Sequence, residues 1–180
     1  MPKTIFLSAG HSGADCGAVS LDKQHKEADL ALTLRDKTAA LLRLAGVTVE
    51  EDGRDGENKP LRDALVLARA HPGRSVEIHF NAAANPAAKG VEALCHPAHK
   101  KLAQELCKAV ASATGSPLRG EYGWKSANSG QHHRLGFCDA GGVILEIEFI
   151  SNPSALQSYL ANADLVSVRL AAVLEQFSKA

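Results

Sequence analysis

The chain has 180 residues, of which 45% are apolar, and its 20 Lys and Arg residues balance 20 Asp and Glu residues. This length is typical of one domain with a core large enough to fold without disulfides, so we expect residues 1–180 to form a single domain. The balanced charge argues against a general attraction to nucleic acid or to an anionic membrane, and no segment approaches the roughly 18 apolar residues of a membrane span.

The N-terminal segment, MPKTIFLSAGHSG, has one lysine and a short apolar run. A signal peptide needs an apolar core of roughly seven residues or more, so we expect synthesis in the cytoplasm without a signal peptide. No CxxC pair occurs among the cysteines, which favours reduced thiols over a disulfide framework. The four cysteines are Cys16, Cys95, Cys107 and Cys138.

The expected strands and helices alternate along the chain. A β-rich run is followed by a glycine-rich loop at the N-terminus, and helical spacing of apolar residues begins soon after it. Segments separated in this way predict an α/β fold with a twisted, mostly parallel sheet flanked by helices. Strands are expected over 4–7, 47–50, 75–82, 90–96 and 143–152, helices over 26–45, 61–71, 99–113 and 156–177, and irregular structure over 115–138.

Polar side chains stand where three of the expected strands end. His11 follows the first strand, His79 and Asn81 lie near the end of the strand 75–82, and Glu146 and Glu148 lie in the last strand. Because ligands of such sheets bind outside the carboxyl ends of the strands, we expect these residues along one rim. Side chains two apart on a strand share a face, so we also expect Glu146 and Glu148 to point the same way.

Glu27 belongs to the first turn of the helix 26–45, on or beside the apolar face that Ala31 and Leu34 define. Each candidate has a structural interpretation: His11 as a loop residue, Glu27 as a favourable charge at a helix N-terminus, His79 as a core histidine. Together, two imidazoles and one carboxylate suit zinc with a fourth position left for water. A further carboxylate, Glu146 or Glu148, would then serve as general base.

The whole set of motifs resembles a known family. The segments IFLSAGHSGADCGA, EIHFNAA, KGVEAL and ILEIEFISNPSAL, with Glu27 at a helix start, are similar to the zinc-dependent N-acetylmuramoyl-L-alanine amidases of the amidase-3 catalytic domain family, over residues 4–177. The resemblance implies that His11, Glu27 and His79 bind Zn²⁺ and that Glu146 is the catalytic base. It also implies a peptidoglycan hydrolase that cuts between the lactyl group of N-acetylmuramic acid and L-alanine of the stem peptide.

Four residues depart from the pattern of that family. Ser12 stands where glycine is common, Cys16 where proline is common, Glu77 where serine is frequent, and Glu148 where glycine is usual. The resemblance therefore assigns Glu148 no role. It is expected to form a salt bridge with Arg119, Lys125 or Arg134, or to raise the pKa of Glu146 as a like charge beside it.

The remaining polar residues are candidate substrate contacts. We expect Asn81, Arg119 and Glu148 to contact substrate, and basic side chains of the segment 115–138 to meet stem-peptide carboxylates. The segment GQHHRLGF, which contains His132 and His133, is interpreted as a rim or substrate-contacting loop because adjacent histidines do not easily share one metal ion.

Three other functions are consistent with parts of the pattern. The paired carboxylates are found in lysozyme-like glycosidases, but Glu146 and Glu148 point the same way instead of facing each other across a sugar. Cys16 beside His11 is compatible with a thiol-dependent wall peptidase, although its loop lacks a helix N-terminus. The fold could also serve a non-catalytic peptidoglycan-binding module. Such a module would not need the four residues that the resemblance assigns to metal binding and catalysis.

The resemblance also leads to expectations about where the protein acts and what it binds. A single catalytic amidase domain over 1–180, with no signal peptide and no separate cell-wall-binding domain, is typical of a phage endolysin that reaches the periplasm through a holin-type pore and lyses the host. An amidase exported by another route and a delivered toxin are the alternatives. We expect a monomer that binds peptidoglycan, with no nucleic-acid partner and no membrane insertion.

Overall fold

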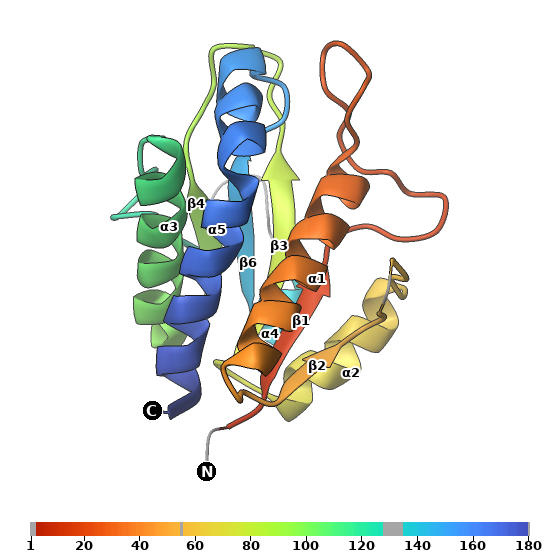
Figure 1. The fold of residues 1–180 in the computed structure, drawn as a ribbon, viewed down its shortest axis with the longest axis vertical. Helices are drawn as coiled ribbons and strands as arrows, with labels where there is room; N and C mark the ends of the chain where they lie inside the picture. Colours follow the sequence, from red (N-terminus) through yellow and green to blue (C-terminus); the bar gives the residue numbers. More distant parts are fainter. Residues whose placement is uncertain (1–2, 55, 128–134, 180) are drawn as a thin grey trace.

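A computed structural model describes residues 3–54, 56–127 and 135–179. These residues form one α/β domain around a six-stranded sheet with the strand order β2-β1-β3-β6-β4-β5 (Figure 1). The strands are β1 (Ile5–Ala9), β2 (Val49–Glu51), β3 (Ser75–Asn81), β4 (Glu92–Cys95), β5 (Trp124–Ser126) and β6 (Val143–Phe149), and the helices are α1 (Glu27–Leu44), α2 (Leu61–Ala70), α3 (Lys100–Thr114), α4 (Gly136–Asp139) and α5 (Pro153–Lys179).

The sheet is mixed and mostly parallel, which confirms the predicted fold class. Strands β2, β1, β3 and β6 run parallel to one another, whereas β4 runs antiparallel to β6 and β5 runs parallel to β4. Residues 115–138 were expected to be irregular, and this expectation is wrong in part, because β5 and α4 lie there. Both elements are short, at three and four residues, so neither has room for a recognisable sequence period.

Helices cover both faces of the sheet. The helices α1, α5 and α3 lie side by side across one face, in front of the sheet in Figure 1, and the larger core lies beneath them. A smaller core, which includes Phe6, Phe137 and Ile144, lies on the opposite face with α2 and α4. Because side chains alternate along a strand, Glu77 and His79 of β3 and Ile144 of β6, which do not enter the larger core, point toward α2 and α4.

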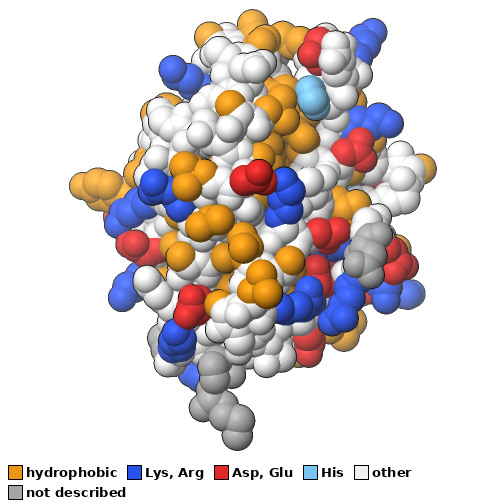
Figure 2. All heavy atoms as spheres, in the orientation of Figure 1, with side chains coloured by type: hydrophobic (Ala, Val, Ile, Leu, Met, Phe, Trp, Pro, Cys, Tyr) orange, Lys and Arg blue, Asp and Glu red, His pale blue; other side chains and the backbone are white. Residues whose placement is uncertain are grey.

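The outer surface of the three-helix layer carries charges of both signs. Figure 2 shows Lys and Arg side chains interspersed with Asp and Glu on this face, with apolar side chains between them. The mixture agrees with the balanced composition of the chain. In the part of the chain that the structure describes, no helix has the length and apolar character needed to cross a membrane.

Candidate metal centre

Three residues that are distant in the sequence meet at one end of the sheet. His11 lies in the loop after β1, Glu27 is the first residue of α1, and His79 lies near the end of β3. Each offers one ligand atom, and these atoms lie within 4.8 Å of one another. The structure thus brings together the three residues that the sequence predicted as metal ligands.

The Glu27 carboxylate lies between the two imidazoles. Its Oε1 is 3.1 Å from Nε2 of His11 and 2.9 Å from Nδ1 of His79. The backbone N–H of Phe80 donates to the same oxygen at 3.0 Å, and the N–H of Ala18 donates to Oε2 at 2.9 Å. Glu27 is buried, so these four contacts hold a carboxylate in a place where an isolated charge would be unfavourable.

The outer nitrogen of each imidazole faces a second carboxylate. Nδ1 of His11 is 2.9 Å from Oδ2 of Asp15, and Nε2 of His79 is 3.6 Å from Oε2 of Glu77. A carboxylate on the outer nitrogen keeps the proton there and leaves the inner nitrogen free to bind a metal. Asp15 and Glu77 are therefore in place to orient the two ligands, a role that the sequence analysis did not assign to them.

The carboxylates make this cluster favourable for positive charge. The hydrogen bond to Glu27 raises the pKa of His11. Burial alone would lower the pKa of His79, but the hydrogen bond to Glu27 and the nearby Glu77 carboxylate outweigh it and raise that pKa well above its ordinary value. Burial likewise disfavours the charged form of Glu27, yet its bonds to His11 and His79 hold the Glu27 pKa well below the usual range. Protons or a divalent cation can supply the positive charge.

The backbone around the ligands is closely packed. A Cβ added to Gly10 would lie 2.2 Å from Cε1 of His79, and one added to Gly17 would lie 2.6 Å from Cδ2 of His11. Only glycine fits at both positions. His11 itself has a left-handed backbone with φ of 65°, a conformation that costs a non-glycine residue of order 1–3 kcal/mol.

Glu146 lies beside the cluster on the neighbouring strand. In the register of β3 and β6, Glu146 is the direct partner of His79, and it lines the same cavity as His11, Glu27 and His79. Its Oε2 is buried and makes no hydrogen bond to any of the described residues. Burial raises the pKa of Glu146 to about 7, and the charges of Glu27 and Glu92 add to this effect. Such a carboxyl is matched to proton transfer near neutral pH.

A larger cavity opens on the α2 and α4 side of the cluster. Its volume is about 340 Å³, and its wall includes His11 and His79, the carboxylates of Asp15 and Glu77, and apolar residues such as Phe137. The volume is within the range of small-molecule sites, and the mixture of polar and apolar groups is typical of them.

Glu92 is a further carboxylate near the centre that the sequence analysis missed. It is the direct partner of Glu146 across β4 and β6, and its Oε2 pairs with Nε of Arg119 at 2.5 Å and with Nζ of Lys125 at 2.7 Å. Asn81 donates from Nδ2 to Glu92 Oε1 at 3.1 Å. The sequence feature that could have identified Glu92 is its place in the segment KGVEAL, where a carboxylate interrupts an apolar strand as Glu146 does in β6.

Glu148 has a different environment from the expected one. The predicted salt bridge to Arg119 or Lys125 is wrong, because both cations pair with Glu92, and Arg134 lies outside the described residues. Oε1 of Glu148 instead accepts hydrogen bonds from the N–H groups of Gly90 at 2.5 Å and Phe149 at 2.9 Å. Glu148 is only 1% exposed, and it does not line the cavity that contains Glu146.

A β-bulge explains why Glu146 and Glu148 differ. His79 pairs with Glu146 while Asn81 pairs with Phe149, so β6 has one residue more than β3 between these pairs. The extra residue breaks the strict alternation on which the expectation of a shared face was based. Sequence alone does not reveal a bulge of this kind.

Of the other residues that the sequence singled out, some lie near the cluster and others do not. Asn81 lines the cavity that contains Glu146, and Arg119 stacks on the ring of Phe149 at 4.8 Å while it pairs with Glu92. His132 and His133 lie outside the described residues. Cys16 donates from Sγ to the carbonyl of Gly17 at 3.4 Å, and His11, which is also described, is hydrogen-bonded to Asp15 instead.

The residues of the cluster fit a zinc ion. Two imidazoles and a carboxylate form the donor set of many catalytic zinc sites, and both imidazoles have a carboxylate on their outer nitrogen. Glu146, which has a buried oxygen without a partner in the described part of the chain, lines the same cavity as the three residues, and a hydrolytic site needs a proton acceptor beside its metal. Among the described residues, no other group of three or more His, Cys, Asp or Glu side chains is close enough to hold a metal ion.

The chain is similar to a known protein family and to solved structures. The family model described as N-acetylmuramoyl-L-alanine amidase matches residues 5–173. A Neisseria meningitidis protein assigned as an N-acetylmuramoyl-L-alanine amidase is 43% identical, with a TM-score of 0.88 over 97% of this chain and 95% of that one. No curated protein sequence matches the chain.

More distant structures share the fold. The catalytic domain of the amidase CwlV from Bacillus (Paenibacillus) polymyxa var. colistinus is 22% identical, with a TM-score of 0.82 and 97% of each chain covered. The catalytic domain of an endolysin that targets Clostridia difficile is 19% identical, with a TM-score of 0.68 and 96% of each chain covered.

Proposed function

The chain belongs to the N-acetylmuramoyl-L-alanine amidase family, and from this membership we propose that it is a zinc-dependent enzyme in which His11, Glu27 and His79 hold the metal and Glu146 is the general base. Its substrate is peptidoglycan. The bond cleaved is the amide between the lactyl group of N-acetylmuramic acid and L-alanine of the stem peptide.

One observation carries the proposal. The buried, unpartnered oxygen of Glu146 lies beside a His, Glu, His cluster whose outer nitrogens face carboxylates. Oε2 of Glu148 is also buried without a partner among the described residues, but Glu148 does not line the cavity that His11, Glu27 and His79 share with Glu146, so it is the position of Glu146 that distinguishes it. A proton acceptor in an amidase needs such a free oxygen within reach of water and substrate.

The reaction divides between the metal and the side chains. When bound, zinc polarises the scissile carbonyl and lowers the pKa of a water molecule. Glu146 takes a proton from the attacking water, whose oxygen forms the new bond to the carbonyl carbon. The same carboxyl then gives the proton to the L-alanine nitrogen as the C–N bond breaks. Asp15 and Glu77 keep His11 and His79 oriented throughout.

We propose that substrate also contacts the residues around Glu92. Asn81 lines the cavity with Glu146, and Arg119 and Lys125 together carry one more positive charge than Glu92 neutralises. Both cations are about one-third exposed, at 36% and 32% of their side chains, so a stem-peptide carboxylate can approach them.

Product analysis tests the proposed reaction. Purified peptidoglycan digested by the enzyme should release peptides with a free L-alanine amino group and leave glycan strands without new reducing ends, as mass spectrometry would show. One zinc per chain is expected by elemental analysis of the same sample. New reducing sugars would indicate a glycosidase, and digestion by zinc-free protein at the same rate would contradict the metal assignment.

We also propose a lytic role of the endolysin type. The fold shared with an endolysin catalytic domain is compatible with this role. A lysis experiment tests the role directly. Expressed in the cytoplasm of a Gram-negative host, the protein should cause lysis only when a holin-type pore is co-expressed. An absence of lysis despite the pore, with full activity on purified peptidoglycan, would favour a wall-remodelling amidase.

A further inference from the structure

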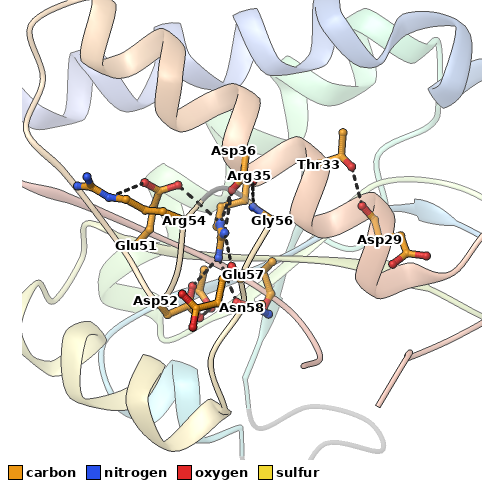
Figure 3. Close-up of polar contacts among 12 residues, drawn as sticks. Asp29, Thr33, Arg35, Asp36, Glu51, Asp52, Arg54, Gly56, Glu57 and Asn58 are labelled. Carbon is orange, nitrogen blue, oxygen red and sulfur yellow. Dashed lines mark hydrogen bonds and ion pairs between the residues drawn. The ribbon is translucent and has the colours of Figure 1, made fainter. Parts of the chain in front are cut away.

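A fully buried arginine lies below the metal centre. Arg35 of α1 is 0% exposed, and Figure 3 shows its guanidinium pointing from α1 toward the loop that follows β2. Nη1 donates to Oδ1 of Asp52 at 3.0 Å and to Oδ1 of Asn58 at 3.1 Å, and Nη2 donates to the carbonyl of Glu57 at 2.7 Å. Nε and Nη2 also contact Asp36, so each N–H of the guanidinium has an acceptor.

Asn58 connects this arginine to the metal loop. Its Nδ2 donates to the carbonyl of Ala9 at 2.6 Å and also to the carbonyl of His11. The same Asn58 side chain therefore contacts Arg35 through its oxygen and the backbone of a metal ligand through its nitrogen. Ser8 of β1 adds a second connection, because its hydroxyl donates to Oδ2 of Asp52 at 2.6 Å.

The chemistry of these neighbours determines which way the Asn58 amide points. A guanidinium can only donate hydrogen bonds, so the group facing Arg35 must be an acceptor. Backbone carbonyls can only accept, so the group facing Ala9 and His11 must be a donor. An asparagine amide meets both demands, whereas an aspartate of the same shape would place an oxygen against two carbonyl oxygens.

His11 needs such support. Its backbone is left-handed at a non-glycine residue, and its imidazole must point at Glu27 for the metal site to form. His11 lies in the loop between β1 and α1, and its backbone carbonyl accepts a hydrogen bond from the side chain of Asn58. Arg35 and Glu27 belong to the same helix, so the network links His11 to the helix that supplies the carboxylate ligand.

We propose that Asn58 is a positioning residue of the metal site, which holds the His11 backbone in place and is itself oriented by Arg35. The inference rests on the proposed role of His11 as a zinc ligand. It implies that the loop between β2 and α2, whose described residues contribute no ligand, contributes to zinc affinity.

Asn58→Asp tests the proposal with an almost isosteric change. We expect its zinc affinity to fall by roughly tenfold or more, the range found when residues that orient metal ligands are lost. Affinity would be measured by competition with a chromogenic chelator, at a temperature where urea unfolding shows the metal-free variant to be fully folded. Asn58→Ala should weaken binding less, because water can replace the lost N–H donors.

Asn162→Asp is a matched control. Asn162 also donates from Nδ2 to a backbone carbonyl, that of Ser158 at 2.9 Å, but it lies in α5 away from the metal centre. Its zinc affinity should equal that of the wild type. If Asn58→Asp does not fold, Asn58→Ala against Asn162→Ala gives the same comparison.

The outcomes separate this proposal from the proposed function. Wild-type protein that binds zinc, together with Asn58 variants that bind it within twofold of wild type, would overturn the role of Asn58 and leave the amidase assignment intact. Asn58 variants that lower the free energy of unfolding but leave zinc affinity unchanged would also overturn the proposal, because a merely structural residue has that effect. Wild-type protein that binds no zinc would overturn both proposals.

Discussion

Glu146 and His79 are direct partners across β3 and β6, yet they have different proposed roles. His79 belongs to the group whose ligand atoms converge, whereas Glu146 has a buried oxygen without a partner among the described residues. Substitution should therefore separate metal binding from turnover.

We expect Glu146→Gln to retain one zinc per chain and to lose turnover by at least 100-fold, because a general acid–base group contributes about 10²–10⁴ in rate. His79→Ala should lose both zinc and turnover. Metal content by elemental analysis and release of L-alanine amino groups would be measured on the same samples. Near-normal hydrolysis by Glu146→Gln would rule out its role as the base.

Burial makes three of the four cysteines poor candidates for a catalytic thiol. Burial raises the pKa of Cys95 to about 11 and that of Cys138 to about 12, and it also raises the pKa of the fully buried Cys107. Thiols of this kind are protonated at neutral pH and react slowly. Only Cys16 of the four has an accessible surface of any size.

We expect iodoacetamide at neutral pH to modify Cys16 alone in the folded protein and to leave amidase activity unchanged, whereas a zinc chelator should abolish it. Peptide mass mapping would identify the modified thiol. Cys16→Ser is the matched variant and should be active, and its inactivity would revive the alternative of a thiol-dependent peptidase.

At the scale of elements, the metal centre depends on how closely the loop after β1 approaches β3. A Cβ at Gly10 would lie 2.2 Å from the His79 ring, closer than any van der Waals contact. The ring or the loop would have to move. Because His79 is held between Glu27 and Glu77, either movement would disturb the ligand set.

Gly10→Ala should therefore weaken zinc binding and lower amidase activity together. Gly136→Ala is the control, since its added Cβ would meet Leu65 at an ordinary distance of 3.5 Å. Zinc affinity of the two variants would be compared by chelator competition. Equal affinity in Gly10→Ala and wild type would show that the loop adapts without cost to the site.

Sequence patterns predicted the elements that have a clear period, and they indicated the candidate ligands, which lie at or near the ends of elements. The helix from Glu27 and the strand with His79 are both present as expected. What could not be predicted depends on contacts between distant segments. The bulge in β6 separates Glu148 from Glu146, and the pairing of Arg119 with Glu92 depends on how β4 lies beside β6. Asn58 lies in a polar loop with no motif.

For the whole molecule, protons, metal and folding are coupled. His11 and His79 have raised pKa values in the folded protein, so the metal-free fold binds protons more tightly than the unfolded chain does. That contribution to stability is complete below the unfolded histidine pKa of about 6.5, and it is lost as pH rises through the folded values. Zinc bound at the proposed site would displace these protons. The zinc-loaded fold is therefore expected to have the opposite dependence and to lose stability as pH falls below about 6.5, where the unfolded histidines take up protons.

The zinc-induced increase in stability should therefore grow as pH rises from about 5 to beyond 6.5, by up to about 1.4 kcal/mol per pH unit for each proton displaced. The free energy of unfolding would be measured by urea titration with and without excess zinc at a series of pH values. His71→Gln is the matched control, because His71 pairs with Glu50 at 3.0 Å outside the metal centre and should leave the slope unchanged. A zinc-induced increment that did not vary with pH would mean that the imidazoles of His11 and His79 do not release protons to the metal, which would contradict their assignment as ligands.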